Sequence, residues 1–384
     1  MTEAHCTYLD HAASTPVRPE ARAALERWLD AANASAVHLP GQAARAAVEE
    51  ARERVATALG ATPSEVVFTS GATEADNLVI KGALWAARER GRQHLVVSDV
   101  EHPAVLEAAR WLADRGEATL SVVPPAPDGR VEVDRVLDAV RADTALVSVM
   151  AANNELGAVN DVAILAGELA ERGVPLHTDA VQALPTRAVD VAGWGVAALA
   201  LSAHKLGGPQ GVGVAVLRRD LPVVPLTHGG GQDRGVRSGT FAVGLDVACA
   251  AALEATVRDR AALDARLGAL SDRLAAGAVA IEGVHRNGPA AAADRLSSHV
   301  HLSLDAADPA ALSLELDRAR VAASTGSACA SGAGQGSHVA AACGLTGTPL
   351  RLSLGWTSTE ADVDRAVEVL ADVVPRVRLD LALS

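Results

Sequence analysis

The chain has 384 residues, of which 49% are hydrophobic and 21% charged, an ordinary globular composition that excludes a disordered chain. Its net charge is −13 and its aromatic content is 2%, which argues against binding to a phosphate backbone or to stacked single-stranded bases. The sequence contains no apolar run of the roughly 18 to 20 residues that a membrane helix needs, and its first residues lack a signal-peptide pattern. We therefore expect a cytoplasmic protein with neither a membrane nor a nucleic acid as partner.

The first two thirds of the chain alternates short apolar runs with helical stretches rich in Ala, Leu, Glu and Arg. This alternation predicts βα units around a mostly parallel sheet, because strands buried on both faces are continuously apolar. We expect a helix over about 74–90. The predicted strands are 66–69, 94–98, 118–123, 144–150, 174–178, 196–202 and 212–217, and the last two are close enough in sequence to be antiparallel neighbours.

The last third of the chain has a different pattern. A long Ala-rich stretch predicts a helix over about 240–277, and α+β elements follow it. These are strands over 299–304 and 350–354 and helices over 309–317 and 359–374. Residues 359–362 resemble a capping box for the last helix. The sequence thus predicts a large α/β domain over 13–257 and a smaller α+β domain made of 1–12 and 258–384.

The four cysteines are Cys6, Cys249, Cys329 and Cys343, and none belongs to a CxxC pair. They are too few and too scattered for a disulfide framework, and we expect no metal site. Cys329 lies in the small-residue segment 324–332, where poor packing favours an exposed, reactive thiol. A buried, inert thiol is the alternative.

Lys205 is the first residue with a chemical interpretation. It closes an apolar strand and precedes a Gly/Pro turn, and Lys81 is the only other lysine among 34 basic residues. Since arginine supplies positive charge almost everywhere else, a lysine at this position indicates a need for an amine. An amine lifted from a buried strand end suits Schiff-base chemistry. A surface lysine in a turn is the alternative.

Two other strand ends carry polar residues. Asp179 ends the strand 174–178, at the edge of a parallel sheet where ligands bind, and a carboxylate there can pair with a protonated pyridine nitrogen. A helix cap and a His-x-Asp metal pair are the alternatives. His102 follows the strand 94–98, where it can stack on a cofactor ring, shuttle a proton or be purely structural. The turn 70–74 enters a helix and offers N–H groups to a phosphate, although ordinary caps look the same.

Six short motifs occur in a specific order along the chain: 70–74, 101–103, 153–155, 177–182, 202–205 and 327–329. With 8–16 and 351–355, they make the chain resemble the cysteine desulfurases of the NifS/IscS type, within the class V aminotransferase superfamily. The resemblance covers about nine tenths of the chain. It implies fold type I of the pyridoxal-phosphate enzymes, a large domain with a mostly parallel seven-stranded sheet plus a smaller α+β domain, in a homodimer.

The resemblance also implies roles for individual residues. Lys205 would hold pyridoxal 5′-phosphate covalently and move protons, Asp179 would pair with the pyridine nitrogen, and His102 would stack on the ring. Further cofactor contacts would come from Ala72 (through its backbone), Thr73, Asn154, Gln182, Ser202, His204 and, from the partner subunit, Thr240. Arg351 would clamp the substrate carboxylate with Asn154 beside it, and Asn33 would lie near the substrate entrance. The family pattern Asn-Pro-Ser-Ser-x-His is altered at 33–38.

The implied reaction converts L-cysteine to L-alanine, with the sulfur captured as a persulfide on Cys329 in a loop of about 322–338. The sulfur would pass to an acceptor protein, such as an iron–sulfur scaffold, a tRNA-thiolation or DNA-modification protein, or another carrier. A selenocysteine lyase or another enzyme of the class V aminotransferase type is the alternative, and a non-catalytic scaffold is the third. The Cys329 loop favours the desulfurase, because the other chemistries do not in general need a loop thiol.

Overall fold

The computed structural model describes residues 6–325 and 337–378, so Cys329 lies outside the described residues. Seven strands form the largest sheet: β2 (Val66–Thr69), β3 (His94–Ser98), β4 (Thr119–Val123), β5 (Thr144–Ser148), β6 (Leu176–Asp179), β7 (Ala198–Ser202) and β8 (Gly213–Leu217). Their order is β2-β8-β7-β6-β5-β3-β4. In this sheet β8 is antiparallel to β2 and β7, and the other neighbours pair in parallel. The predicted mostly parallel seven-stranded sheet is confirmed, and so is the antiparallel pairing of its last two predicted strands.

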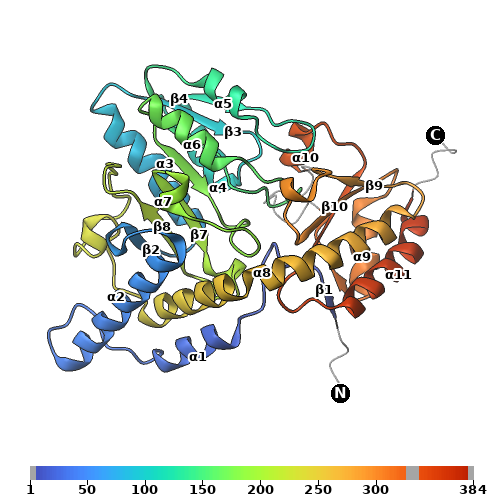
Figure 1. Cartoon of the computed structure of the whole chain (residues 1–384), viewed down its shortest axis with the longest axis horizontal. Helices are drawn as coiled ribbons and strands as arrows, with labels where there is room; N and C mark the ends of the chain where they lie inside the picture. The colour runs from blue at the N-terminus through green and yellow to red at the C-terminus, as the bar shows by residue number, and fades with distance from the viewer. Residues whose placement is uncertain (1–5, 326–336, 379–384) are drawn as a thin grey trace.

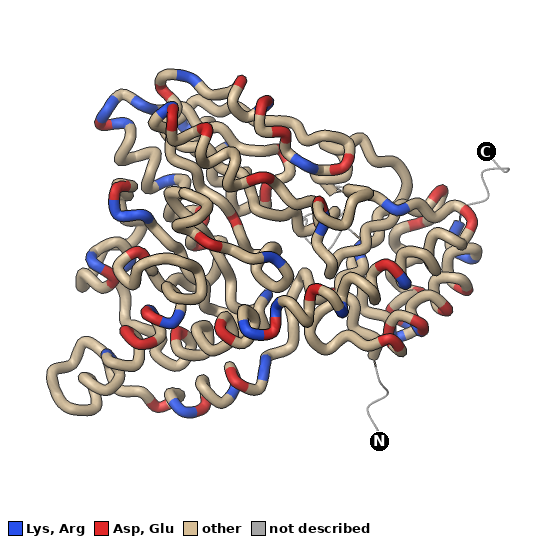
Figure 2. The backbone as a smooth tube through the Cα atoms, viewed as in Figure 1, with Lys and Arg blue, Asp and Glu red and all other residues tan. Residues whose placement is uncertain are grey.

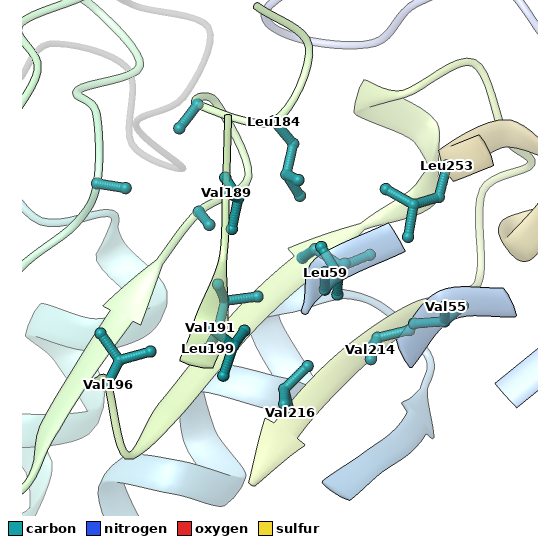
Figure 3. Close-up of a cluster of buried hydrophobic side chains, with 14 of the residues drawn as sticks. Val55, Leu59, Leu184, Val189, Val191, Val196, Leu199, Val214, Val216 and Leu253 are labelled. Carbon is teal, nitrogen blue, oxygen red and sulfur yellow. The ribbon is translucent and has the colours of Figure 1, made fainter. Parts of the chain in front are cut away.

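Helices cover both faces of this sheet (Figure 1). One face packs on α3 (Ala72–Arg88) and α4 (Pro103–Asp114), and the other packs on α2 (Leu39–Leu59), α6 (Val162–Glu171) and the first part of α8 (Val243–Val279). The remaining helices and 3-10 turns of this region are α1 (Pro19–Arg27), η1 (Pro63–Glu65), α5 (Val133–Ala139), α7 (Val191–Trp194), η2 (Ala203–Lys205) and η3 (Asp233–Gly235). In Figure 3, Val55 and Leu59 of α2 lie against Val214 of β8. Strands that are buried on both faces explain why their sequences are continuously apolar.

Helix α8 has 37 residues and extends from the large sheet to the elements of the last third of the chain (Figure 1), so it contributes to two hydrophobic cores. Its buried residues up to Leu253 pack in the core of the large sheet, and those from Leu263 to Ala278 pack in a second core. The second core lies on the antiparallel sheet β12-β10-β9. The elements of this part are β1 (Thr7–Tyr8), β9 (Val284–Asn287), η4 (Ala292–Asp294), β10 (His299–Leu304), α9 (Pro309–Arg318), β11 (Val321–Ala322), α10 (His338–Ala342), β12 (Thr348–Ser353) and α11 (Glu360–Val377).

The predicted division of the chain into 13–257 and 258–384 falls inside the continuous helix α8. Most buried hydrophobic residues of 13–257 pack in the cores of the large sheet, and most of those from 1–12 and 258–384 pack in the second core. Leu296, Val339 and Cys343, however, come from the second range and pack in the core of the large sheet. The domain boundary itself stays a prediction.

Several predicted elements have shifted ends. The helix expected over 74–90 spans Ala72–Arg88, and the strand expected over 144–150 ends at Ser148. Val149 and Met150 are nevertheless buried, because the chain that follows the strand stays inside the core, and an apolar run therefore overestimates the strand. The capping box of α11 is confirmed, since Thr359 and Asp362 exchange backbone-to-side-chain hydrogen bonds of 2.9 and 3.3 Å.

Charged residues of both signs are interspersed along most of the chain (Figure 2). The segment 31–44 contains no Asp, Glu, Lys or Arg; it comprises the connection to α2 and the start of that helix, and it is the uncoloured part at the lower left of Figure 2. Across the described ranges, none of the helices combines the length and the apolar character needed to cross a membrane.

Candidate functional site

A cleft of about 470 Å³ lies at the carboxyl ends of the parallel strands. This is the edge where open α/β sheets bind ligands, and the volume suits a small cofactor together with an amino acid. The cleft brings together ten of the residues singled out in the sequence: Ala72, Thr73, His102, Asn154, Asp179, Gln182, Ser202, His204, Lys205 and Arg351.

Lys205 ends the 3-10 turn η2, which directly follows β7. Its side chain reaches across the cleft and donates hydrogen bonds from Nζ to the carbonyl oxygens of Ala12 and, at 2.6 Å, Ala13. The segment 12–14 thus forms one wall of the cleft, and the amine lies inside the cleft rather than on an outer turn. A lysine in this position can attack a carbonyl group bound between the walls.

Asp179 is the last residue of β6 and is 5% exposed. Its Oδ1 accepts a hydrogen bond of 2.8 Å from the backbone N–H of Val181. Burial raises the pKa of Asp179, and the Val181 N–H, His177 and Lys205 oppose that rise. Gln182 follows on the same turn, and its Nε2 donates to the Ala12 carbonyl at 3.0 Å. The cleft thus has a buried carboxylate on its sheet side, suited to a cationic ring nitrogen.

His102 precedes α4 and caps it, because its Nδ1 accepts a hydrogen bond of 3.1 Å from the N–H of Ala104. The ring proton of neutral His102 therefore belongs on Nε2. Burial, together with Lys205 and His338, lowers the pKa of His102 to about 4. At neutral pH the ring is uncharged and held at one nitrogen, which suits stacking against a planar ligand.

The turn between β2 and α3 forms a place for an anion. Gly71 is the N-cap of α3, and Ala72 and Thr73 of the first turn line the cleft together with Ser202. Gly71 has a φ of +156°, a backbone conformation that L side chains rarely adopt, and a Cβ added there would be in ordinary contact with Ser202 Oγ at 3.7 Å. Helix N-termini with nearby hydroxyl groups bind phosphate. His204 completes the wall, with its Nδ1 at 3.3 Å from Ser14 Oγ.

Arg351, on β12, approaches the cleft from the second core and has 5% of its side chain exposed. Its Nη2 pairs with Asp10 Oδ1 at 2.7 Å, and its Nη1 donates to the Asn154 carbonyl at 3.0 Å. Arg351 Nε and Asn154 Oδ1 are buried without a hydrogen-bond partner. Unsatisfied polar groups of this kind indicate a polar ligand. Asp10 lies in the motif 8–16, although no role is expected for it from the sequence.

Three residues of the expected site are not among those lining the cleft. Asn33 and Thr240 are exposed and lie outside its wall, and Cys329 lies outside the described residues. Ser324 and His338, which are described residues on either side of the Cys329 segment, contact residues in or next to the cleft. Ser324 exchanges backbone hydrogen bonds of 2.7 and 3.1 Å with Arg351, and His338 Nε2 lies 3.0 Å from the Glu101 carbonyl oxygen.

Comparisons with known proteins agree with this geometry. Residues 7–366 match the family model of aminotransferase class-V. The chain is 45% identical to an "IscS-like cysteine desulfurase" of Mycobacterium tuberculosis, with 97% of each chain covered. It superposes on a solved "NIFS-LIKE PROTEIN" with a TM-score of 0.90 at 30% identity, covering 97% of this chain and 100% of that one. A structure described as "SspA in complex with cysteine" gives a TM-score of 0.79 at 32% identity, covering 90% and 98%.

Proposed function

The chain belongs to the aminotransferase class-V family, and from this membership we propose that it is a pyridoxal-phosphate-dependent cysteine desulfurase. The observation that carries the proposal is the convergence of Lys205, Asp179 and His102 in one cleft, with Arg351 on the opposite wall. Relatives named cysteine desulfurase, and a related structure described as holding cysteine, support the same substrate.

The polar groups of the cleft match pyridoxal phosphate part by part. The amine of Lys205 is the partner for its aldehyde, the carboxylate of Asp179 for its pyridine nitrogen, and the neutral ring of His102 for its planar face. The N-terminus of α3, with Thr73, Ser202 and His204, is the partner for its phosphate. When bound, the cofactor withdraws electrons from the Cα atom of an amino acid.

The remaining groups act on the substrate. Arg351 and Asn154 hold the carboxylate of L-cysteine, and Lys205 Nζ takes the proton from its Cα and returns one to the product. The thiolate of Cys329 attacks the sulfur of the substrate, so a sulfur–sulfur bond forms as the Cβ–sulfur bond breaks. L-Cysteine and the Cys329 thiol thereby yield L-alanine and a Cys329 persulfide, with no outside oxidant or reductant.

This function can be tested directly with the purified protein. With L-cysteine and a thiol reductant, we expect L-alanine and sulfide to form in equal amounts, because each turnover releases one of each. Both products are quantified over time, and the absorbance of the bound cofactor is recorded in parallel. A protein that binds pyridoxal phosphate but releases neither product from L-cysteine would contradict the desulfurase proposal.

We also infer a homodimer, in which Thr240 of the partner subunit completes the phosphate site. Apolar side chains gather on the uncharged segment 31–44 and just before it: Leu29, Val37 and Leu39 are 72%, 90% and 80% exposed. Exposed apolar residues on an uncharged segment, as Val37 and Leu39 are here, are typical of interfaces. The segment that contains Thr240 lies beside this surface, since Arg45 of α2 stacks over Phe241 at 5.7 Å.

Replacing both Val37 and Leu39 with Asp should dissociate the dimer, because two charges would be buried in an apolar contact. We expect the wild type to sediment at twice the mass of the chain and the double variant at the mass of one chain. The double variant should also bind pyridoxal phosphate at least about tenfold more weakly, since it loses the partner's phosphate contact. Ile164→Asp, at a residue of α6 that is 60% exposed, is the matched control and should remain dimeric. A dimeric Val37→Asp/Leu39→Asp protein would place the interface elsewhere.

The acceptor of the sulfur is a protein with a reactive thiol or a cluster-building site, and we propose a cytoplasmic location. Cys329 must be a reduced thiol before it can attack the substrate sulfur, and the cytosol keeps thiols reduced. The three cysteines in the described part of the chain, Cys6, Cys249 and Cys343, are all free thiols.

A further inference from the structure

Three carboxyl groups are buried together beneath the cleft. Asp76 of α3 and Glu101, which follows β3, are 0% exposed, and Asp179 of β6 is 5% exposed. The positive charge of Lys205 acts on Asp179, one of these three carboxyl groups, and favours its ionised form. Buried carboxylates need a counter-charge or hydrogen bonds, and one lysine cannot balance three of them. Some of these groups must therefore be neutral, and their hydrogen bonds indicate which.

The three carboxyl groups differ in the hydrogen bonds that their oxygens accept. Asp179 accepts from the Val181 N–H, and Glu101 Oε1 accepts from Ser98 Oγ at 2.5 Å and from the Met150 N–H at 2.7 Å. Neither oxygen of Asp76 has a hydrogen-bond partner. Of the three carboxyl groups, Asp76 is therefore the one whose ionised form is least stabilised by hydrogen bonds.

His177 is the neighbour of Asp76, and it too has a buried ring nitrogen without a hydrogen-bond partner. Nε2 of His177 lies 3.4 Å from Asp76 Oδ1, and both atoms are buried without a hydrogen-bond partner. Nδ1 of His177 lies 2.9 Å from Ser148 Oγ on the neighbouring strand β5. A proton between Nε2 and Oδ1 keeps two lone pairs from facing each other, and either His177 or Asp76 can carry it. We place it on Asp76, because no other donor supports an ionised Asp76 beside two further buried carboxyl groups; the ring proton of His177 is then on Nδ1, facing Ser148.

We propose that Asp76 is a protonated, neutral acid hydrogen-bonded to His177, and that it positions this histidine while leaving Asp179 as the anion that faces the cofactor. The inference rests on the proposed function only for the pairing of Asp179 with the pyridine nitrogen. Asp76 touches neither substrate nor cofactor, so it is a positioning residue and acts through β6, which carries both His177 and Asp179.

The surroundings of Asp76 support its neutral form. Burial is the main cause that raises the pKa of Asp76 well above its usual range, and the charge of Asp179 raises it further. Burial lowers the pKa of His177 to about 4, so the ring supplies no positive charge at neutral pH. The packed strands β2, β5, β7 and β8 contain no titratable residue, and the charged residues of α4, which are Glu107, Arg110 and Asp114, are exposed. Glu101 is the remaining neighbour, and burial raises its pKa as well.

The first test compares the thermal unfolding of the full chain with that of Asp76→Asn at several pH values. An acid whose pKa is higher in the folded than in the unfolded state loses stability as pH rises above about 3.9, its unfolded value. Asn cannot titrate, and its amide can donate to His177. We therefore expect Asp76→Asn to melt at nearly the wild-type temperature near pH 4 and at least about 2 °C higher near pH 8. A variant that is less stable than wild type near pH 8, or a difference that does not change with pH, would overturn the proposal.

The second test measures the affinity for pyridoxal phosphate by absorbance titration. Asp76→Asn should bind within about threefold of wild type, whereas Asp76→Leu, which cannot donate to His177, should bind at least about tenfold more weakly. Equal loss in both variants would mean that Asp76 acts as an anion, and no loss in Asp76→Leu would remove the positioning role. Asp179→Asn serves as the reference: if it binds the cofactor like wild type, the proposed pairing of Asp179 fails, and the unfolding test still decides the state of Asp76.

Discussion

Replacing Lys205 with alanine should abolish the covalent attachment of pyridoxal phosphate and lower the turnover of L-cysteine by at least about a thousandfold. The variant loses the amine that attacks the aldehyde and the group that moves the Cα proton, and a positioned acid–base group alone is worth about 10²- to 10⁴-fold. The attachment is measured without activity: borohydride reduction fixes the cofactor to the chain, and mass spectrometry locates it. We expect the label on the peptide that contains Lys205 in the wild type and no label in the variant.

The chain provides its own control for this experiment. Lys81 is the only other lysine, and its Nζ lies 4.6 Å from the ring centre of Trp111 on the surface of α3 and α4. Lys81→Ala should keep the label, the absorbance and the turnover of the wild type. A label on Lys81, or full turnover by Lys205→Ala, would contradict the assigned role of Lys205.

Replacing Cys329 with serine should stop sulfide production and reduce alanine production to background, while the absorbance of the bound cofactor remains. Serine is nearly the same size, but its hydroxyl cannot accept the substrate sulfur as a persulfide, so the step that breaks the Cβ–sulfur bond has no nucleophile. A persulfide is detected by trapping with an alkylating reagent after one turnover and mass spectrometry of the peptide. The expected mass is that of one additional sulfur atom on the peptide of Cys329.

The other cysteines differ in how well they could replace it. Burial raises the pKa of Cys343 to about 11 and raises the pKa of Cys249 still further, so neither is a thiolate at neutral pH. Cys6 is exposed and is therefore the appropriate control. Cys6→Ser should retain the activity of wild type. If Cys329→Ser still makes alanine at the wild-type rate, the protein acts as a lyase without a protein thiol.

The sequence predicts the fold well where hydrophobicity determines it. The strands of the large sheet are buried on both faces, so each is a recognisable apolar run, and all seven were identified. Their ends were less accurate, because Val149 and Met150 are buried outside any strand. The short pair β1 and β11 is held together by residues more than 300 positions apart, and two residues in each strand leave no periodic pattern.

The residues of the site also fall into those that the sequence predicts and those that it does not. Residues at the end of a strand or within a few residues after it, such as Asp179, His102 and Lys205, meet in the cleft because the topology of parallel strands brings their carboxyl ends together. Asp10 and Asp76 gave no such signal. Asp76 lies on a helix where an acidic residue is ordinarily exposed, and only the packing of α3 on the sheet shows that it is buried. Thr240 and Asn33 do not line the cleft of a single chain, and the role of Thr240 rests on the proposed dimer.

The single helix α8 restricts how the two halves of the molecule can move. Its 37 residues span about 55 Å, so it acts as a rod anchored in both cores. Between Leu253 and Leu263, the stretch 257–262 has no buried side chain and is held from outside by ion pairs of Arg258 with Glu20 and of Asp259 with Arg18. A change in the separation of the two cores would therefore require α8 to bend or unwind within this stretch. Lys205 lies just after a strand of the large sheet and Arg351 on β12 of the second core, so widening the cleft would require the same bend in α8.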